Sequence, residues 1–307
     1  MVRAYLTGGS GFVGGWLRAH LEDQGDEVVL TDAEVDVTDG EALRAALVPV
    51  APDVIYHLAA LSHVGRSWVD PARTFQVNAV GTLQVLEAAS HCAAPPAVVV
   101  VSSAEVYGQA AGDEPVTEQA ALRPVTPYAV SKVAAEYLAL QAWLGRGLRA
   151  VRARPFNHVG PGQSPDFVVS ALARRIARAE RSGGGEVRVG NLDASRDFTD
   201  VRDVVRAYRL LAEHALSSRA FAGEVYNVAT GTAVTIAEVA RRLTALAKVP
   251  VELVRDPALF RPVEVPVFVG DAVLLRSLTG WAPRIGFDET LADMLNYWRT
   301  QLAKQQD

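Results

Sequence analysis

Apolar and polar residues alternate along the first half of the chain in blocks typical of strands and helices. Short β-branched apolar runs predict strands buried on both faces, at residues 2–7, 27–31, 53–57, 98–101 and 148–153. Apolar residues spaced three or four apart predict amphipathic helices between them, at residues 12–24, 41–47, 71–90 and 127–144. This alternation predicts an α/β fold, with a doubly wound parallel sheet of the Rossmann type.

The pattern changes after Pro155. Residues 157–163 are irregular and rich in glycine and proline. Later helical patterns span residues 167–181, 201–216, 236–247 and 289–302, and a strand pattern spans 224–228. We expect a first domain of residues 1–155 plus returning segments at about 199–228. A smaller α/β lobe would then comprise residues 156–198 and 229–307.

Composition narrows the class of protein. The 307 residues carry 30 Lys and Arg against 35 Asp and Glu, a formal charge of −5, which argues against nucleic acid or an anionic membrane as a partner. The single cysteine, Cys92, excludes an internal disulfide and a cysteine-bound zinc, and six scattered histidines predict no metal site. No apolar run reaches the ~20 residues of a membrane span. We expect a cytoplasmic protein without a signal peptide.

A glycine-rich turn lies between the first predicted strand and helix. Residues 8–14 read GGSGFVG, which spaces Gly8, Gly11 and Gly14 three residues apart. Such a turn lets the backbone approach a pyrophosphate, whose charge rests on the partial positive charge of the helix N-terminus. The turn therefore predicts that the first domain binds a dinucleotide.

Asp32 follows the second predicted strand, 18 residues after Gly14. A carboxylate at about this distance accepts hydrogen bonds from a ribose 2′-hydroxyl and repels a 2′-phosphate, which favours NAD(H) over NADP(H). A solvated turn aspartate is the alternative. Asp36 and Val37 lie close enough in sequence to reach the adenine.

Tyr128 and Lys132 are spaced i and i+4, which places both on one face of the predicted helix. A nearby ammonium stabilises a phenolate, so we expect Lys132 to lower the pKa of Tyr128 and make it a general acid or base. Ser103 follows the strand at residues 98–101 and can present its hydroxyl to the same substrate oxygen.

These residues resemble the extended short-chain dehydrogenases/reductases that act on nucleotide sugars. The resemblance also rests on HLAA at residues 57–60 and on SSAEVYG at residues 102–108. It implies that Ser103, Tyr128 and Lys132 form the catalytic triad. It further places at the cofactor Phe12, Val13, Leu58, Ala59, Ala60, Tyr128, Lys132, Pro155 and His158.

Three segments of the second half resemble the GDP-mannose dehydratases and reductases: RPFNHVGPGQ at residues 154–163, VGNLDASRDFTDVRD at 189–203 and RPVEVP at 261–266. The likeness to reductases of GDP-4-keto-6-deoxy-D-mannose covers nearly the whole chain. It assigns to the substrate Ser103, Glu105, Asn157, Arg196, Arg261 and Glu264. Arginines suit a diphosphate because they stay charged and bind in forks, but Arg196 and Asp197 could instead form a structural salt bridge.

The resemblance implies reduction of the 4-keto group of a GDP-linked 6-deoxyhexose, with GDP-D-rhamnose as product and NAD(H) or NADP(H) as cofactor. GDP-mannose 4,6-dehydration is the main alternative, because Glu105 lies where the dehydratases carry a base. The short, acidic residues 31–36 leave no room for the arginine-rich arm of those enzymes. A 4-epimerase and a non-catalytic dinucleotide sensor are the further alternative functions. The helices at 71–90 and 127–144 imply a homodimer with a four-helix interface.

Overall fold

The computed structural model describes residues 1–31, 35–110, 114–218, 223–259 and 266–304. A six-stranded parallel sheet forms its centre, in the order β2-β1-β3-β4-β5-β9. The strands are β1 (Arg3–Thr7), β2 (Glu27–Leu30), β3 (Val54–His57), β4 (Ala97–Val101), β5 (Ala150–Pro155) and β9 (Val225–Val228). The sheet and a smaller α/β lobe confirm the predicted Rossmann-type fold.

Helices cover both faces of this sheet, which explains why its central strands are largely buried. One face packs on α1 (Phe12–Asp23) and α8 (Val201–Ser217), through inward residues such as Leu6, Leu17 and Leu211. The other face packs on α2 (Gly40–Leu47), α5 (Gly81–Ser90) and α6 (Pro127–Arg146). Tyr5 lies in this second core although its neighbours Ala4 and Leu6 lie in the first, as the two-residue repeat of a strand requires.

The strand order reverses between β1 and β3. The chain moves outward from β1 to β2 on one side and then continues from β3 to β5 on the other. In an open parallel sheet, ligands bind outside the carboxyl ends of the strands at this reversal. The glycine turn after β1 and the segment after β3 both lie there.

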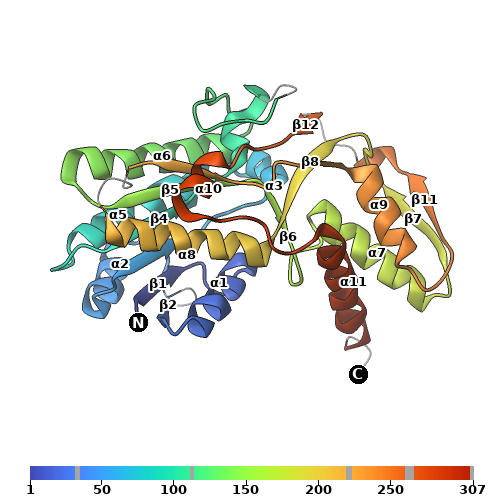
Figure 1. Cartoon of the computed structure of the whole chain (residues 1–307), viewed down its shortest axis with the longest axis horizontal. Coiled ribbons are helices and arrows are strands. Elements are labelled where there is room, and N and C mark those ends of the chain that lie inside the picture. Colours follow the sequence, from blue (N-terminus) through green and yellow to red (C-terminus); the bar gives the residue numbers. More distant parts are fainter. Residues whose placement is uncertain (32–34, 111–113, 219–222, 260–265, 305–307) are drawn as a thin grey trace.

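Most of the remaining elements form a lobe beside the sheet and its helices (Figure 1). Its separate apolar core packs α7 (Val168–Arg181), α9 (Ile236–Ala245) and α11 (Phe287–Ala303) together. Its strands are β6 (Asn157–Val159), β7 (Gly185–Val189), β8 (Ser195–Asp200), β10 (Ala233–Thr235), β11 (Val251–Arg255) and β12 (Val267–Phe268). Strand β6 pairs with β8, and β11 pairs with β7.

Shorter helical elements complete the chain: η1 (Val48–Val50), α3 (Val64–Val69), α4 (Pro71–Phe75), η2 (Gln76–Val80), η3 (Ala104–Ala110), η5 (Pro257–Leu259) and α10 (Val273–Thr279). The predicted helix over residues 71–90 is therefore interrupted, because η2 is one π-helical turn between α4 and α5. Within the described ranges, no helix has the length and apolar character needed to cross a membrane.

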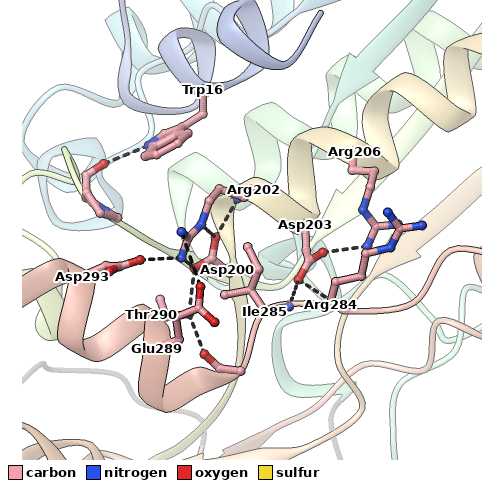
Figure 2. A network of polar contacts seen from close by, with 12 residues as sticks. Trp16, Asp200, Arg202, Asp203, Arg206, Arg284, Ile285, Glu289, Thr290 and Asp293 are labelled. Atoms are coloured by element: carbon pink, nitrogen blue, oxygen red, sulfur yellow. Dashed lines mark hydrogen bonds and ion pairs between the residues drawn. The ribbon is translucent and has the colours of Figure 1, made fainter. Parts of the chain in front are cut away.

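A polar network joins the lobe to the N-terminus of α8 (Figure 2). Asp200 caps α8, accepts two side-chain hydrogen bonds from Arg202 at 2.9 Å and accepts the Thr290 hydroxyl at 2.7 Å. Arg202 also pairs with Asp293 of α11 at 2.9 Å. The indole of Trp16 lies on the other side of Arg202 and donates to the Pro161 carbonyl at 2.9 Å. Helices α1, α8 and α11 are thus connected beside the segment that follows β6.

Candidate active site

The turn between β1 and α1 has no room for side chains at two of its glycines. Gly8 has a φ of +76°, and a Cβ there would lie 2.6 Å from the Ala59 nitrogen. A Cβ at Gly14 would lie 2.1 Å from the Gly8 carbonyl oxygen. Gly11 begins α1 without a side-chain cap, and the first turn holds no acidic residue. The open helix N-terminus fits the pyrophosphate of a dinucleotide.

Leu58, Ala59 and Ala60 follow β3, and the backbone of Leu58 and Ala59 lies beside this turn. Leu58 donates its N–H to the Thr7 carbonyl at 3.1 Å, and Ala59 donates to the Thr7 hydroxyl at 3.3 Å. His57 ends the buried strand and contacts the hydroxyls of Thr7 and Thr82, at 2.8 and 3.0 Å. Burial lowers its pKa to about 3, so this imidazole is neutral and structural.

The predicted adenosine side of the site is described only in part. Asp32 lies outside the described residues. The Asp36 carboxylate accepts the Thr38 N–H and hydroxyl, at 2.9 and 2.8 Å, and pairs with Arg73 at 3.3 Å. The hydrogen bonds from Thr38 lower the pKa of Asp36. Val37 packs against Gly81, where an added Cβ would approach the valine methyl group to 2.9 Å.

The predicted catalytic groups come together where β4 ends and α6 begins. Thr126 caps α6 by accepting the Ala129 N–H at 3.0 Å, which places buried Tyr128 in its first turn. Burial raises the pKa of Tyr128 to about 12, although its hydrogen bond with Ser103 opposes the rise. Glu105 also acts to raise this pKa. Ser103 is half-buried and accepts the Glu105 N–H at 3.2 Å.

Lys132 lies one turn further along α6 and is also buried. Its Nζ donates to the Val101 carbonyl at 2.8 Å and lies 6.0 Å from the centre of the Tyr128 ring. Burial lowers the pKa of Lys132 to about 8, against the effect of Glu136. The expected lowering of the Tyr128 pKa by Lys132 is not seen, because burial of the phenol dominates.

Asn78 is a site-forming residue that the sequence reasoning missed. It lies in the π-helical turn and is bound twice to the backbone of Leu61, through its Oδ1 at 2.8 Å and its Nδ2 at 3.1 Å. Its Nδ2 also donates to the Ser131 hydroxyl at 2.9 Å, which in turn donates to the Tyr128 carbonyl. Asn78 therefore ties the segment after β3 to the catalytic helix.

The segment after β5 lies across the glycine helix. Pro155 ends β5, Asn157 is exposed in β6, and the half-buried His158 ring stacks on Phe12 with centroids 6.1 Å apart. Burial lowers the pKa of His158 to about 4, so the ring is neutral. Val13 is half-buried in the first turn of the same helix.

Asn157 and Arg196 lie on neighbouring parallel strands, since Asn157 pairs with Phe198. Arg196 is half-buried and donates to the Ser195 carbonyl at 2.8 Å. Its neighbour Asp197 binds the backbone N–H groups of Thr230, Gly231 and Gly270. The carboxylate considered for a salt bridge with Arg196 is thus used to shape two loops. Arg261 and Glu264 lie outside the described residues.

The family comparison matches this architecture. The family model described as GDP-mannose 4,6 dehydratase matches residues 30–294. The chain belongs to this family, within the extended short-chain dehydrogenases/reductases. It is 39% identical to a GDP-6-deoxy-D-mannose reductase of Pseudomonas aeruginosa, over 99% of both chains.

One solved structure and one dehydratase extend the comparison. A structure of RMD from Pseudomonas aeruginosa complexed with NADPH matches with a TM-score of 0.89 and 38% identity, covering 98% of this chain and 100% of the other. A GDP-mannose 4,6 dehydratase of Drosophila melanogaster is 31% identical over 85% of this chain but only 69% of its own length. The dehydratase thus extends beyond the matched region, whereas the reductase does not.

Proposed function

We propose that this chain reduces the 4-keto group of GDP-4-keto-6-deoxy-D-mannose to give GDP-D-rhamnose. The observation that carries the proposal is the arrangement of Ser103, buried Tyr128 and buried Lys132 together where β4 ends and α6 begins. The match to a reductase over the full length of both chains supports the same reaction.

The cofactor in this proposal is NADH or NADPH, with NADH favoured by Asp32. The backbone of Gly8, Gly11 and Gly14 would hold the pyrophosphate. The residues expected to contact the rest of the dinucleotide are Phe12, Val13, Asp36, Val37, Leu58, Ala59, Ala60, Pro155 and His158. The reduced nicotinamide supplies the hydride for the sugar C4 when bound. Comparing kcat/KM for NADH and NADPH tests the preference.

Tyr128 would donate its proton to the sugar O4 as the carbonyl becomes an alcohol. A pKa of about 12 keeps the phenol protonated at neutral pH, which is the state a general acid needs. The Ser103 hydroxyl would hydrogen-bond the same oxygen. An ammonium has three N–H donors, and Lys132 uses one on Val101, so the others can hold the nicotinamide ribose.

The GDP-sugar would lie between the catalytic residues and the lobe. Asn157 and Arg196 are brought near each other by the pairing of β6 with β8. We propose that Arg196 binds the diphosphate together with Arg261, and that Glu264 accepts from ribose or guanine donors. The catalytic part, residues 1–155 with 199–228, would then bind the dinucleotide, and residues 156–198 and 229–307 would bind the sugar nucleotide.

GDP-mannose 4,6-dehydration is the second candidate, and Glu105 is the observation that favours it. This carboxylate begins the turn after Ser103 and acts electrostatically on Tyr128. It could remove the C5 proton in an elimination. The unmatched length of the dehydratase relative weighs against this candidate. A non-catalytic dinucleotide sensor is the candidate from another class.

A homodimer is part of the proposal. Helices α4, α5 and α6 and the π-helical turn η2 present an apolar groove lined by Phe75, Ala79, Val80, Leu83, Ala134, Tyr137 and Leu138. Tyr137 is 57% exposed and Phe75 is 43% exposed, which is unusual for side chains of this size. Pairing of this face with a second copy would form a four-helix interface.

The test of the function supplies GDP-4-keto-6-deoxy-D-mannose with NADH or NADPH and identifies the product by NMR. GDP-D-rhamnose supports the proposal. A parallel reaction with GDP-mannose and NAD or NADP tests for dehydration. Tight binding of the dinucleotide without turnover of any nucleotide sugar would favour the sensor.

A further inference from the structure

A fully buried ion pair lies directly behind the predicted catalytic groups. Glu136 is one turn after Lys132 and two turns after Tyr128, so the three side chains follow one face of α6. Glu136 has no exposed surface, and its partner Arg154 is 3% exposed. The pair is bidentate, with Arg154 Nε 2.8 Å from Oε1 and Nη2 2.5 Å from Oε2.

The carboxylate has a third partner that leads to the site. The Ser102 hydroxyl donates to Glu136 Oε1 at 2.5 Å. Ser102 is the residue before Ser103, and its own N–H donates to the Ala153 carbonyl of β5 at 2.8 Å. The residue before Ser102 is also bound by a side chain of α6, because Lys132 Nζ donates to the Val101 carbonyl. Two successive turns of α6 therefore hold two successive residues at the end of β4.

We propose that Glu136 is a positioning residue that sets the place of the Ser103 hydroxyl through Ser102. The inference rests on the proposed function, because it assumes that Ser103 contacts the reacting oxygen. Ser103 lies two positions beyond the last strand residue, where its carbonyl accepts the Val106 N–H at 3.3 Å and its hydroxyl accepts the Glu105 N–H at 3.2 Å. Both of these bonds come from the turn that follows Ser103, whereas the side-chain bond of Ser102 fixes the residue before it to α6.

Stability alone does not account for this arrangement. Buried ion pairs are often no more stabilising than apolar residues of the same volume, because both charges lose their hydration. Arg154 also binds the Tyr107 hydroxyl at 2.9 Å, and Tyr107 donates to Asn227 at 2.7 Å. These bonds anchor the guanidinium to η3 and β9, so that the carboxylate it holds has a defined position under Ser102.

The decisive variant is Ser102→Ala, which removes the hydroxyl but leaves the Glu136–Arg154 pair and Ser103. We expect kcat to fall about tenfold, since small displacements of a reacting group are costly, with KM for sugar and cofactor within about twofold of wild type. Ser102→Thr keeps a hydroxyl and should restore kcat. Thr290→Val is the matched control, because it removes a buried hydroxyl–carboxylate bond of similar length far from Tyr128.

The control should lower the melting temperature about as much as Ser102→Ala and leave kcat unchanged. Glu136→Gln keeps an acceptor for Ser102 but breaks the ion pair, so it should lower the melting temperature while its kcat stays above that of Ser102→Ala. Equal kcat values for wild type and Ser102→Ala would overturn the inference, as would an equal loss in Thr290→Val.

A crystal structure of Ser102→Ala provides a readout that does not depend on turnover. The inference predicts that the Ser103 hydroxyl moves away from Tyr128, and an unmoved Ser103 contradicts it. If the wild-type chain does not reduce GDP-4-keto-6-deoxy-D-mannose, the proposed function fails. The movement of Ser103 still decides whether Glu136 and Ser102 position it.

Discussion

Gly14 and Gly15 are neighbours in α1, but only Gly15 has room for a methyl group. A Cβ at Gly14 would lie 2.1 Å from the Gly8 oxygen and 2.5 Å from the Gly9 Cα, whereas a Cβ at Gly15 meets no atom within 4 Å. Ordinary contacts of a Cβ begin at 3.4 Å, so Gly14→Ala must push the turn outward by about 1.3 Å.

The two alanine substitutions should therefore affect stability differently: Gly15→Ala should raise the free energy of unfolding, and Gly14→Ala should not. Alanine in a helix is favoured over glycine by ~1 kcal/mol, and Gly15→Ala should raise the free energy of unfolding by about this amount. At Gly14 the overpacking costs ~1–3 kcal/mol and should cancel that gain. Because the clash is with the phosphate-binding turn itself, we expect the Kd for NADH and NADPH to rise at least ~10-fold.

Fluorescence titration of NADH and NADPH measures the cofactor affinity, and thermal unfolding without cofactor measures the stability. Gly15→Ala serves as the matched control in both. Wild-type affinity in Gly14→Ala would refute the placement of the pyrophosphate on this turn. Equal weakening in both variants would show that the helix, rather than the close approach at Gly14, is responsible.

Three further predictions test the site and the surface. Tyr128→Phe should lower the steady-state rate of reduction at least ~10²-fold while dinucleotide binding persists, and wild-type turnover would contradict the general-acid role. In a pH profile, kcat/KM for reduction should decline above about pH 8 as buried Lys132 loses its proton, while Tyr128 stays protonated. A flat profile up to pH 10 would contradict this. A change in kcat/KM centred near pH 6.5 would also contradict it, because His57 and His158 are both neutral at that pH. Tyr137→Glu should convert the dimer to a monomer in light scattering, whereas the same change at exposed Val273, remote from the groove, should leave it a dimer.

The strand–helix alternation was predictable because it depends on local pattern. Strands β1 to β5 are short apolar runs, and helices α1, α2 and α6 repeat their apolar residues every three or four positions. The interruption of the helix predicted over residues 71–90 could not be predicted, since each residue there is compatible with a helix. Asn78 of the π-helical turn is bound to Leu61 and Ser131, which lie 17 and 53 residues away in the sequence.

The lobe was harder to predict because long-range contacts decide it. Strand β7 includes the end of a glycine run and pairs with β11, which lies over 60 residues away. In α7, Arg174 lies over the Trp298 ring at 5.3 Å, and Arg181 donates to the Leu302 carbonyl, so both pack against α11.

The sequence pattern identifies the triad residues, but it does not show which residues hold them in place. Glu136 continues the four-residue spacing from Tyr128 and Lys132, and that signal could have identified it. Its partners Arg154 and Ser102 are 18 and 34 residues away, so only the fold shows that they meet.

The most direct test of the account is the reaction itself. Purified chain is incubated with GDP-4-keto-6-deoxy-D-mannose and NADH or NADPH, and the hexose is identified by NMR, with Tyr128→Phe as the control. The account predicts stoichiometric oxidation of the cofactor and GDP-D-rhamnose as the product, with both lost in the control. An unchanged keto sugar, or the 4-epimeric alcohol, would contradict it.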